Sequence, residues 1–92
     1  MQNNALRIDE NDNVAIATQP ISKGGPVIIN SQRLFEAVDD VEPGHKVALA
    51  PIAAGENVFR YGEPIVQATR AIERGEWVHV HNTQPIPGDL KR

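Results

Sequence analysis

The stretch WVHVHN, residues 77–82, places two histidines, His79 and His81, one residue apart. Because alternate side chains of a β-strand point to opposite faces, the pattern predicts that Val78 and Val80 face the core while both imidazoles emerge side by side on the other face. Neighbouring imidazoles can bind a divalent metal or an anionic substrate. Two solvent-facing polar residues on a half-buried strand would show the same pattern, and the spacing alone favours that simpler interpretation.

Two further stretches carry charged or aromatic side chains beside a glycine. His45 and Lys46 follow Gly44 and would form a cationic turn tip suited to a carboxylate. Arg60 and Tyr61 precede a second glycine, where a guanidinium and a phenol could recognise a carboxylate or hydroxyl groups. Either stretch could instead be an ordinary polar turn. In the second stretch, the ring of Tyr61 would then pack over a sheet edge.

The chain has 92 residues, which is one domain with no room for two independent cores. Its aromatic residues are one Trp, one Tyr and two Phe, so the core must be mainly aliphatic and little chain is left to enclose a deep active site. We therefore do not expect a complete enzyme, and we favour a module that lends residues to something larger. The lack of cysteine excludes disulfides and thiolate ligands and is compatible with a cytoplasmic location. A formal net charge of −3, without a basic cluster or a long apolar segment, argues against nucleic-acid binding and against a membrane location.

Four segments share the pattern aliphatic-x-x-Gly-x-x-Val and divide the chain into two similar halves. They are ISKGGPV, VEPGHKV, IAAGENV and IERGEWV, which start at Ile21, Val41, Ile52 and Ile72. The first and third segments are separated by the same step as the second and fourth, which predicts an internal repeat. Glycine supplies the positive φ of a tight turn and valine begins the next strand. We therefore predict turns at Gly24, Gly44, Gly55 and Gly75.

Short runs rich in Val, Ile and Ala precede these turns, and seven prolines and seven glycines are spread along the chain. This composition predicts an all-β domain of short strands over residues 1–83, with residues 84–92 as a C-terminal tail or linker. Residues 31–38 could form a short helix capped by Ser31, or the return arm of a hairpin that turns at Asn30 and Ser31. The hairpin is favoured.

Four segments taken in order, DNVAIA, GHKVAL, RYGEPI and WVHVHNT, resemble the amino-terminal domain of altronate and galactarate dehydratases. The resemblance extends from about residue 11 to residue 83. Its most specific parts are the Gly-His-Lys and the closing His-x-His-Asn, which is closer to the altronate branch. That domain belongs to the SAF group, whose small β-clip fold with pseudo-twofold halves agrees with the internal repeat.

The resemblance implies part of a hydro-lyase that removes water from a sugar acid to give a 2-keto-3-deoxy acid. The expected site residues are His45 and Lys46 in catalysis, Arg60, Tyr61 and Asn82 in substrate binding, and His79 and His81 as ligands of Fe²⁺ or Mn²⁺. A large dehydratase domain or subunit would be the partner that completes this site. We therefore expect the isolated domain to bind metal weakly or not at all and to leave its histidines largely exposed.

One position departs from the family pattern. Val66-Gln67 stands where the family commonly has glycine followed by an aromatic residue, and a Cβ at position 66 restricts the backbone there. Two alternatives stay open. The chain could be a non-catalytic SAF module that binds a small acid or a protein, or the small subunit of an enzyme like sulfolactate sulfo-lyase.

Overall fold

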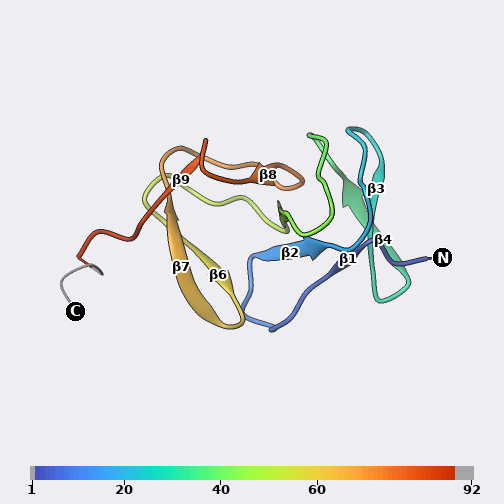
Figure 1. Ribbon diagram of the computed structural model, residues 1–92, viewed down its shortest axis with the longest axis horizontal. Coiled ribbons are helices and arrows are strands. Elements are labelled where there is room, and N and C mark those ends of the chain that lie inside the picture. Colours follow the sequence, from blue (N-terminus) through green and yellow to red (C-terminus); the bar gives the residue numbers. More distant parts are fainter. Residues whose placement is uncertain (1, 89–92) are drawn as a thin grey trace.

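The computed structural model describes residues 2–88, and all of its regular elements are short β-strands (Figure 1). They are β1 (Ala5–Leu6), β2 (Val14–Ala17), β3 (Pro26–Ile29), β4 (Gln32–Glu36), β5 (Lys46–Ala48), β6 (Asn57–Arg60), β7 (Glu63–Ala68), β8 (Trp77–Val78) and β9 (Thr83–Gln84). These described residues form no helix, and hence none that is long and apolar enough to cross a membrane. The predicted all-β fold is confirmed.

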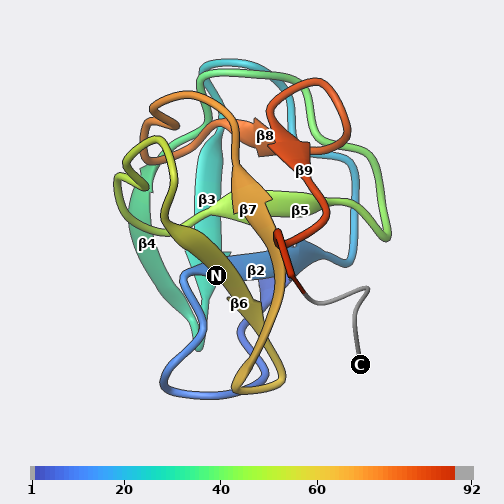
Figure 2. The same ribbon diagram turned by 90° about the vertical axis from the view of Figure 1, so that its left-hand side faces the viewer.

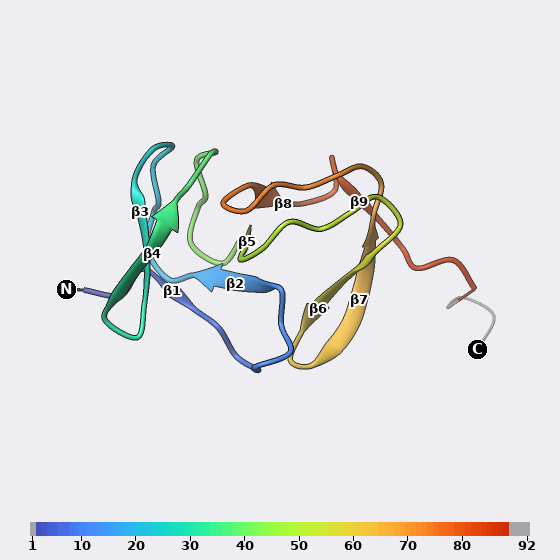
Figure 3. The same cartoon turned by 180° about the vertical axis from the view of Figure 1, so that it is seen from behind.

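A central four-stranded antiparallel sheet, in the order β1-β2-β5-β8, lies between two β-hairpins. Hairpin β3–β4 stands at one end of the molecule, and hairpin β6–β7, extended by β9, stands at the other (Figure 1, Figure 3). Viewed along the long axis, the hairpin strands run steeply across β2 and β5 (Figure 2). The molecule is therefore two hairpins held together by one shared sheet.

The internal repeat predicted from the glycine pattern is present in the backbone. All four turn glycines have positive φ, namely 83° at Gly24, 86° at Gly44, and 87° at Gly55 and Gly75. Their hydrogen bonds recur at the same step: Gly24 N–H to Ala37 O matches Gly55 N–H to Ala68 O, and Gly44 N–H to Ala17 O matches Gly75 N–H to Ala48 O. The isolated bridges Ile21–Val41 and Ile52–Ile72 match in the same way.

Both hairpins turn on two residues with positive φ, as type I′ turns require. In β3–β4 these are Asn30 and Ser31, with φ of 52° and 62°; in β6–β7 they are Tyr61 and Gly62, with φ of 58° and 74°. The antiparallel pairing of β4 with β3 confirms the hairpin, rather than the helix, for residues 31–38. A left-handed backbone suits Asn and Gly but is strained for a bulky residue such as Tyr61.

A β-bulge interrupts each hairpin at the same place, next to Ile28 in β3 and next to Phe59 in β6. One asparagine from the preceding segment supports each bulge. The Asn4 side chain accepts the Ile28 N–H at 2.9 Å, and the Asn13 side chain accepts the Phe59 N–H at 2.8 Å. Side-chain amides thus satisfy backbone groups that the interrupted ladder leaves unpaired.

Two apolar clusters lie on opposite faces of the central sheet, one beneath each hairpin. The cluster beneath β3–β4 comprises Ala5, Ala15, Ala17, Ile21, Val27, Ile29, Ala37, Val41 and Val47. The cluster beneath β6–β7 comprises Val14, Ala48, Ile52, Val58, Ala68, Ile72 and Val78. Strands β2 and β5 supply side chains to both clusters by alternation, so the two are not independent cores.

The prediction that both valines of WVHVHN face the core is wrong at Val80, whose exposed fraction is 78%. Strand β8 ends at the buried Val78. Beyond it, the Asn82 side chain accepts the His79 N–H at 2.9 Å, and Thr83 Oγ1 donates to the His79 carbonyl at 2.7 Å. The Asn82 and Thr83 side chains thus take the backbone N–H and carbonyl of His79, which a continuing strand would use for pairing, and the chain turns at this point.

The predicted C-terminal tail begins at Gln84, which is the last residue of β9 and pairs with Gln67 of β7. Residues 89–92 of that tail lie outside the described part of the chain. The boundary between a domain over residues 1–83 and a tail over residues 84–92 stays a prediction.

Candidate functional site

All three histidines of the chain gather around its one tryptophan. We call His45, Trp77, His79 and His81 the histidine–indole cluster. Trp77 and His79 have ring planes 12° apart and centroids separated by 4.9 Å, and the centroids of His45 and His79 are 5.2 Å apart at 8°. His81 is tilted by 37° at 5.0 Å from Trp77. The indole, to which the sequence alone assigned no role, is the platform on which the imidazoles meet.

The cluster is positioned by a glycine turn and a strand pair. His45 follows Gly44, the turn glycine at the start of β5. Trp77 of β8 pairs with Val47 of β5. The backbone N–H of Trp77 donates to the Asp39 carboxylate at 3.0 Å. Antiparallel partners share a face, and His45 stands two residues before Val47, so His45 and Trp77 lie on the same side of the sheet.

One hydrogen bond determines what His45 can do chemically. The indole Nε1–H of Trp77 donates to Nδ1 of His45 at 3.1 Å. A neutral imidazole that accepts at Nδ1 carries its proton on Nε2. To bind a metal through Nε2, His45 would have to give up that proton or the bond from Trp77. The arrangement therefore favours His45 as a hydrogen-bond donor over His45 as a metal ligand.

The rings of His79 and His81 make no hydrogen bond within the part of the chain that the structure describes. Stacking leaves His45 and His79 half-buried, whereas His81 is exposed as expected. Residues 2–88 contain no group of three or more His, Asp or Glu side chains placed to hold a metal ion. The chain thus offers two free imidazoles, and Fe²⁺ or Mn²⁺ would need further ligands from another domain. Metal binding by this pair stays a prediction.

A hollow of about 260 Å³ opens beside the cluster. It is lined by Asp40, Glu42, His45 and Trp77. The two acidic side chains disfavour a negatively charged ligand at this place, whereas hydroxyl groups or a cation would be accepted. The hollow is therefore a poor place for the carboxylate of a sugar acid.

A buried polar network supports the turn that carries His79. Asn82 is fully buried, and its Nδ2 donates to Glu76 Oε2 at 3.2 Å and to the Trp77 carbonyl at 2.8 Å. Glu76 also forms a 2.7 Å ion pair with Arg70. Burial alone would raise the pKa of the Glu76 carboxyl, but hydrogen bonds from the Glu73 N–H and from the Asn82 and Arg70 side chains outweigh burial and lower it. The Asn82 amide is occupied within the chain, and its contact with a substrate hydroxyl stays a prediction.

Lys46 belongs to the opposite face of the sheet from its neighbour His45, because it pairs with Val78 of the second apolar cluster. Burial lowers the pKa of Lys46, and the nearby positive charge of Arg60 lowers it further. The Arg60 guanidinium lies 5.3 Å from the ring centroid of Tyr61, whose exposed fraction is 60%. Within this chain, Lys46 therefore groups with Arg60 and Tyr61 and not with the histidines.

Residues 3–85 match the family described as the altronate/galactarate dehydratase SAF domain. The altronate dehydratase of Escherichia coli (strain K12) is 41% identical over 85 residues, which make up 92% of this chain and 17% of that protein. The altronate dehydratase of Bacillus subtilis (strain 168) is 36% identical over 86 residues, or 94% of this chain and 17% of that protein. The (2R)-sulfolactate sulfo-lyase subunit alpha of Paracoccus pantotrophus is 42% identical over 53 residues, or 58% of this chain and 79% of that subunit. The chain spans only 17% of the length of these altronate dehydratases, and it belongs to the altronate/galactarate dehydratase SAF domain family.

Proposed function

We propose that this chain is the small subunit or amino-terminal domain of a sugar-acid dehydratase of the altronate or galactarate type. It acts with a larger catalytic domain or subunit and helps to form the site that eliminates water to give a 2-keto-3-deoxy acid. The observation that carries the proposal is the histidine–indole cluster, which presents three imidazoles on one side of a domain of this family. The large share of the altronate dehydratases that this chain does not span supports the need for a partner.

Elimination of water from a hydroxy acid breaks a C–H bond beside the carboxylate and a C–O bond at the next carbon. The departing oxygen needs a hydrogen-bond donor, because hydroxide is a poor leaving group. His45 can supply that bond from Nε2, since Trp77 holds its Nδ1 as an acceptor. Lys46 lies on the opposite face of the sheet from His45 and is not placed at this oxygen, so its role in catalysis stays a prediction.

His79 and His81 would hold Fe²⁺ or Mn²⁺ together with ligands from the larger domain. When bound, such an ion would stabilise the negative charge that develops on the enolate. Two imidazoles from the small domain leave coordination positions open for the partner and the substrate.

The proposal is tested by mixing the chain with a large dehydratase subunit and measuring turnover of altronate and galactarate. His79→Ala and His81→Ala should each reduce the bound metal and lower turnover by about 10- to 100-fold or more, because loss of even an outer-shell partner of a metal costs that much. Val80→Ala is the matched control, because Val80 lies between the two histidines with its side chain exposed. Full turnover and unchanged metal content in both histidine variants would contradict the proposed metal site and would show that the two histidines are ordinary surface residues.

A second candidate is the small subunit of a sulfolactate sulfo-lyase-like enzyme. It is favoured by the similarity to a subunit alpha of which this chain matches 79%. Assaying the same reconstituted complex with (2R)-sulfolactate separates the two, because release of sulfite would replace release of water. A chain that neither activates a large subunit nor changes its metal content would instead be a non-catalytic binding module.

A further inference from the structure

The two apolar clusters correspond position by position under the internal repeat, with two exceptions. The matching pairs are Ala5 and Val14, Ala17 and Ala48, Ile21 and Ile52, Val27 and Val58, Ala37 and Ala68, Val41 and Ile72, and Val47 and Val78. The two remaining members of the first cluster, Ala15 and Ile29, are 1% and 6% exposed. Their counterparts in the second half are Lys46 and Arg60.

The correspondence is supported by strand pairing as well as by position in the chain. Ile29 pairs with Gln32 at the end of its hairpin, and Arg60 pairs with Glu63 at the same place in the other hairpin. Strand β1 contacts β3 in one half, and β2 contacts β6 in the other. The cations Lys46 and Arg60 thus occupy the places that the other half fills with the apolar side chains of Ala15 and Ile29.

This substitution is unfavourable for the fold by itself. Lys46 and Arg60 are both half-buried, and each raises the electrostatic free energy of the other because they carry the same charge. The Arg60 Nε–H is fully buried and has no hydrogen-bond partner among the residues that the structure describes. Among residues 2–88 the ion pairs are Arg33–Glu36 and Arg70–Glu76, so neither cation forms an ion pair with a described carboxylate.

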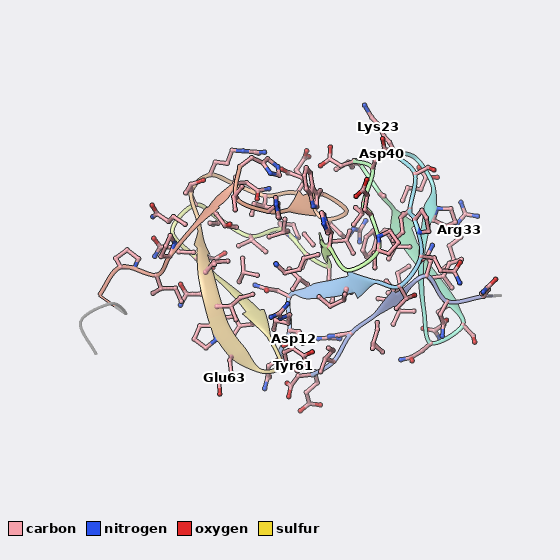
Figure 4. All side chains as sticks on the ribbon, in the orientation of Figure 1. Asp12, Lys23, Arg33, Asp40, Tyr61 and Glu63 are labelled. Atoms are coloured by element: carbon pink, nitrogen blue, oxygen red, sulfur yellow. The ribbon has the colours of Figure 1, made fainter. Side chains whose placement is uncertain are left out.

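The turn beside this pair carries a second unfavourable feature. Tyr61 has φ of 58°, where the other half has Asn30, and its side chain is 60% exposed and packs in no core. The buried carboxylate of Asp12 accepts the backbone N–H groups of Tyr61 and Gly62 at 3.0 and 2.8 Å. Figure 4 shows Asp12 beside Tyr61 at this tip. Asp12 is therefore occupied by the turn rather than by the cations.

We propose that Lys46 and Arg60 form a binding site for the carboxylate of a small hydroxy acid, with Tyr61 placed to contact its hydroxyl groups. A carboxylate between the two side chains would remove their repulsion. A planar guanidinium that turns toward it can bind it with two parallel hydrogen bonds, one of them from the Nε–H that is unpaired within residues 2–88. The choice of a carboxylate over other anions rests on the proposed function. Lys46 is then a substrate-binding residue, on the other sheet face from the histidine–indole cluster.

The test is an NMR titration of the intact chain with D-altronate, following the Arg60 Nε–Hε and Lys46 side-chain signals. We expect saturable shifts of both signals at millimolar concentration. Altritol, which has the same carbon chain without a carboxylate, should leave both signals unmoved, and inorganic phosphate should bind at least tenfold more weakly. Absence of saturable shifts with altronate, or phosphate binding as tight as altronate binding, would overturn the proposal.

The double variant Lys46→Ala/Arg60→Ile restores the side chains of the first half. It should abolish altronate binding, followed here through the backbone amide signals of Tyr61 and Gly62, while raising the thermal midpoint. The matched control Lys23→Ala/Arg33→Ile removes the same charges from exposed positions near the other hairpin, away from Tyr61 (Figure 4), and should leave the titration at Arg60 unchanged. Lys46→Met, which keeps the side-chain volume, serves as a second variant and should weaken binding at least tenfold.

Two outcomes of the variant experiment contradict the site: altronate binding that survives in both Lys46→Met and the double variant, or a double variant less stable than the parent chain. The dehydratase role can fail independently of this result. It is decided by turnover in the complex with the large subunit, whereas carboxylate binding is measured on this chain alone.

Discussion

The hairpins β3–β4 and β6–β7 have the same backbone and different side chains at their tips. Both have a bulge supported by an asparagine and a two-residue turn with positive φ. At the end of the strand one has Ile29, buried beneath the hairpin, and the other has Arg60. The shared residues are those that the backbone requires. The differing residues are charged or aromatic, which is the pattern expected if the proposed carboxylate site belongs to one copy of the hairpin.

The two turns that flank β5 and β8 differ in a similar way. Gly44 is followed by His45, whose ring joins the histidine–indole cluster, and Gly75 is followed by Glu76, which is buried in the network with Arg70. Equivalent backbone positions thus carry a candidate catalytic group in one copy and a supporting group in the other. A control substitution at Glu76 would therefore disturb the fold, whereas one at Val80 would not.

The largest expected difference between the halves concerns the residues that hold the hairpin turns. Asp12 is 3% exposed and accepts the N–H groups of Asp9, Tyr61 and Gly62, whereas the exposed Asn3 accepts only that of Ser31. Asp12→Ala should lower the free energy of unfolding by about 3 kcal/mol because it leaves buried donors unpaired, and Asn3→Ala by less than about 1 kcal/mol. Urea unfolding measures both. Equal losses would show that burial does not distinguish the two turns.

A medium effect is expected at Glu76, and it should depend on pH. Glu76→Gln should cost about 2 kcal/mol at pH 7, because hydrogen bonds to a charged carboxylate are lost. The pKa of Glu76 is lowered in the folded chain, so its contribution is fully present above the unfolded value of about 4.3 and is lost as pH falls through the folded value. The difference between parent and variant should therefore shrink at acidic pH in urea unfolding curves. Glu73→Gln, at an exposed position of the same turn, is the control.

The smallest effect concerns the exchange of the turn residues themselves. Tyr61→Asn should raise the free energy of unfolding by about 1 kcal/mol, because Asn-Gly is the preferred pair for a type I′ turn. Asn30→Tyr should lower it by a similar amount. Thermal unfolding of the two variants measures both changes. If Tyr61→Asn lowers the free energy of unfolding, the ring of Tyr61 stabilises the fold. The strained backbone at Tyr61 would then need no functional explanation.

The sequence by itself determined the architecture. Glycine at four repeated positions was enough to predict the turns and the two halves, because a tight turn with positive φ tolerates few other residues. The choice of a hairpin for residues 31–38 was also correct. The alternation pattern predicted the wrong orientation for Val80. The side chains of Asn82 and Thr83 end the strand by hydrogen bonds to the backbone of His79, which an alternation pattern does not reveal.

Only the tertiary structure decided which polar residues act together. His45 and Lys46 are adjacent in the chain and were expected to approach one site, but alternation along the sheet sends them to opposite faces. His45 packs against Trp77 and His79 of the neighbouring strand and turn. It accepts a hydrogen bond from the indole of Trp77, which lies 32 residues away in the sequence. Lys46 and Arg60 occupy the places that the other half fills with the apolar side chains of Ala15 and Ile29. Such pairings depend on strand register and on which face each cluster occupies, and these are properties of the assembled sheet rather than of any local stretch of sequence.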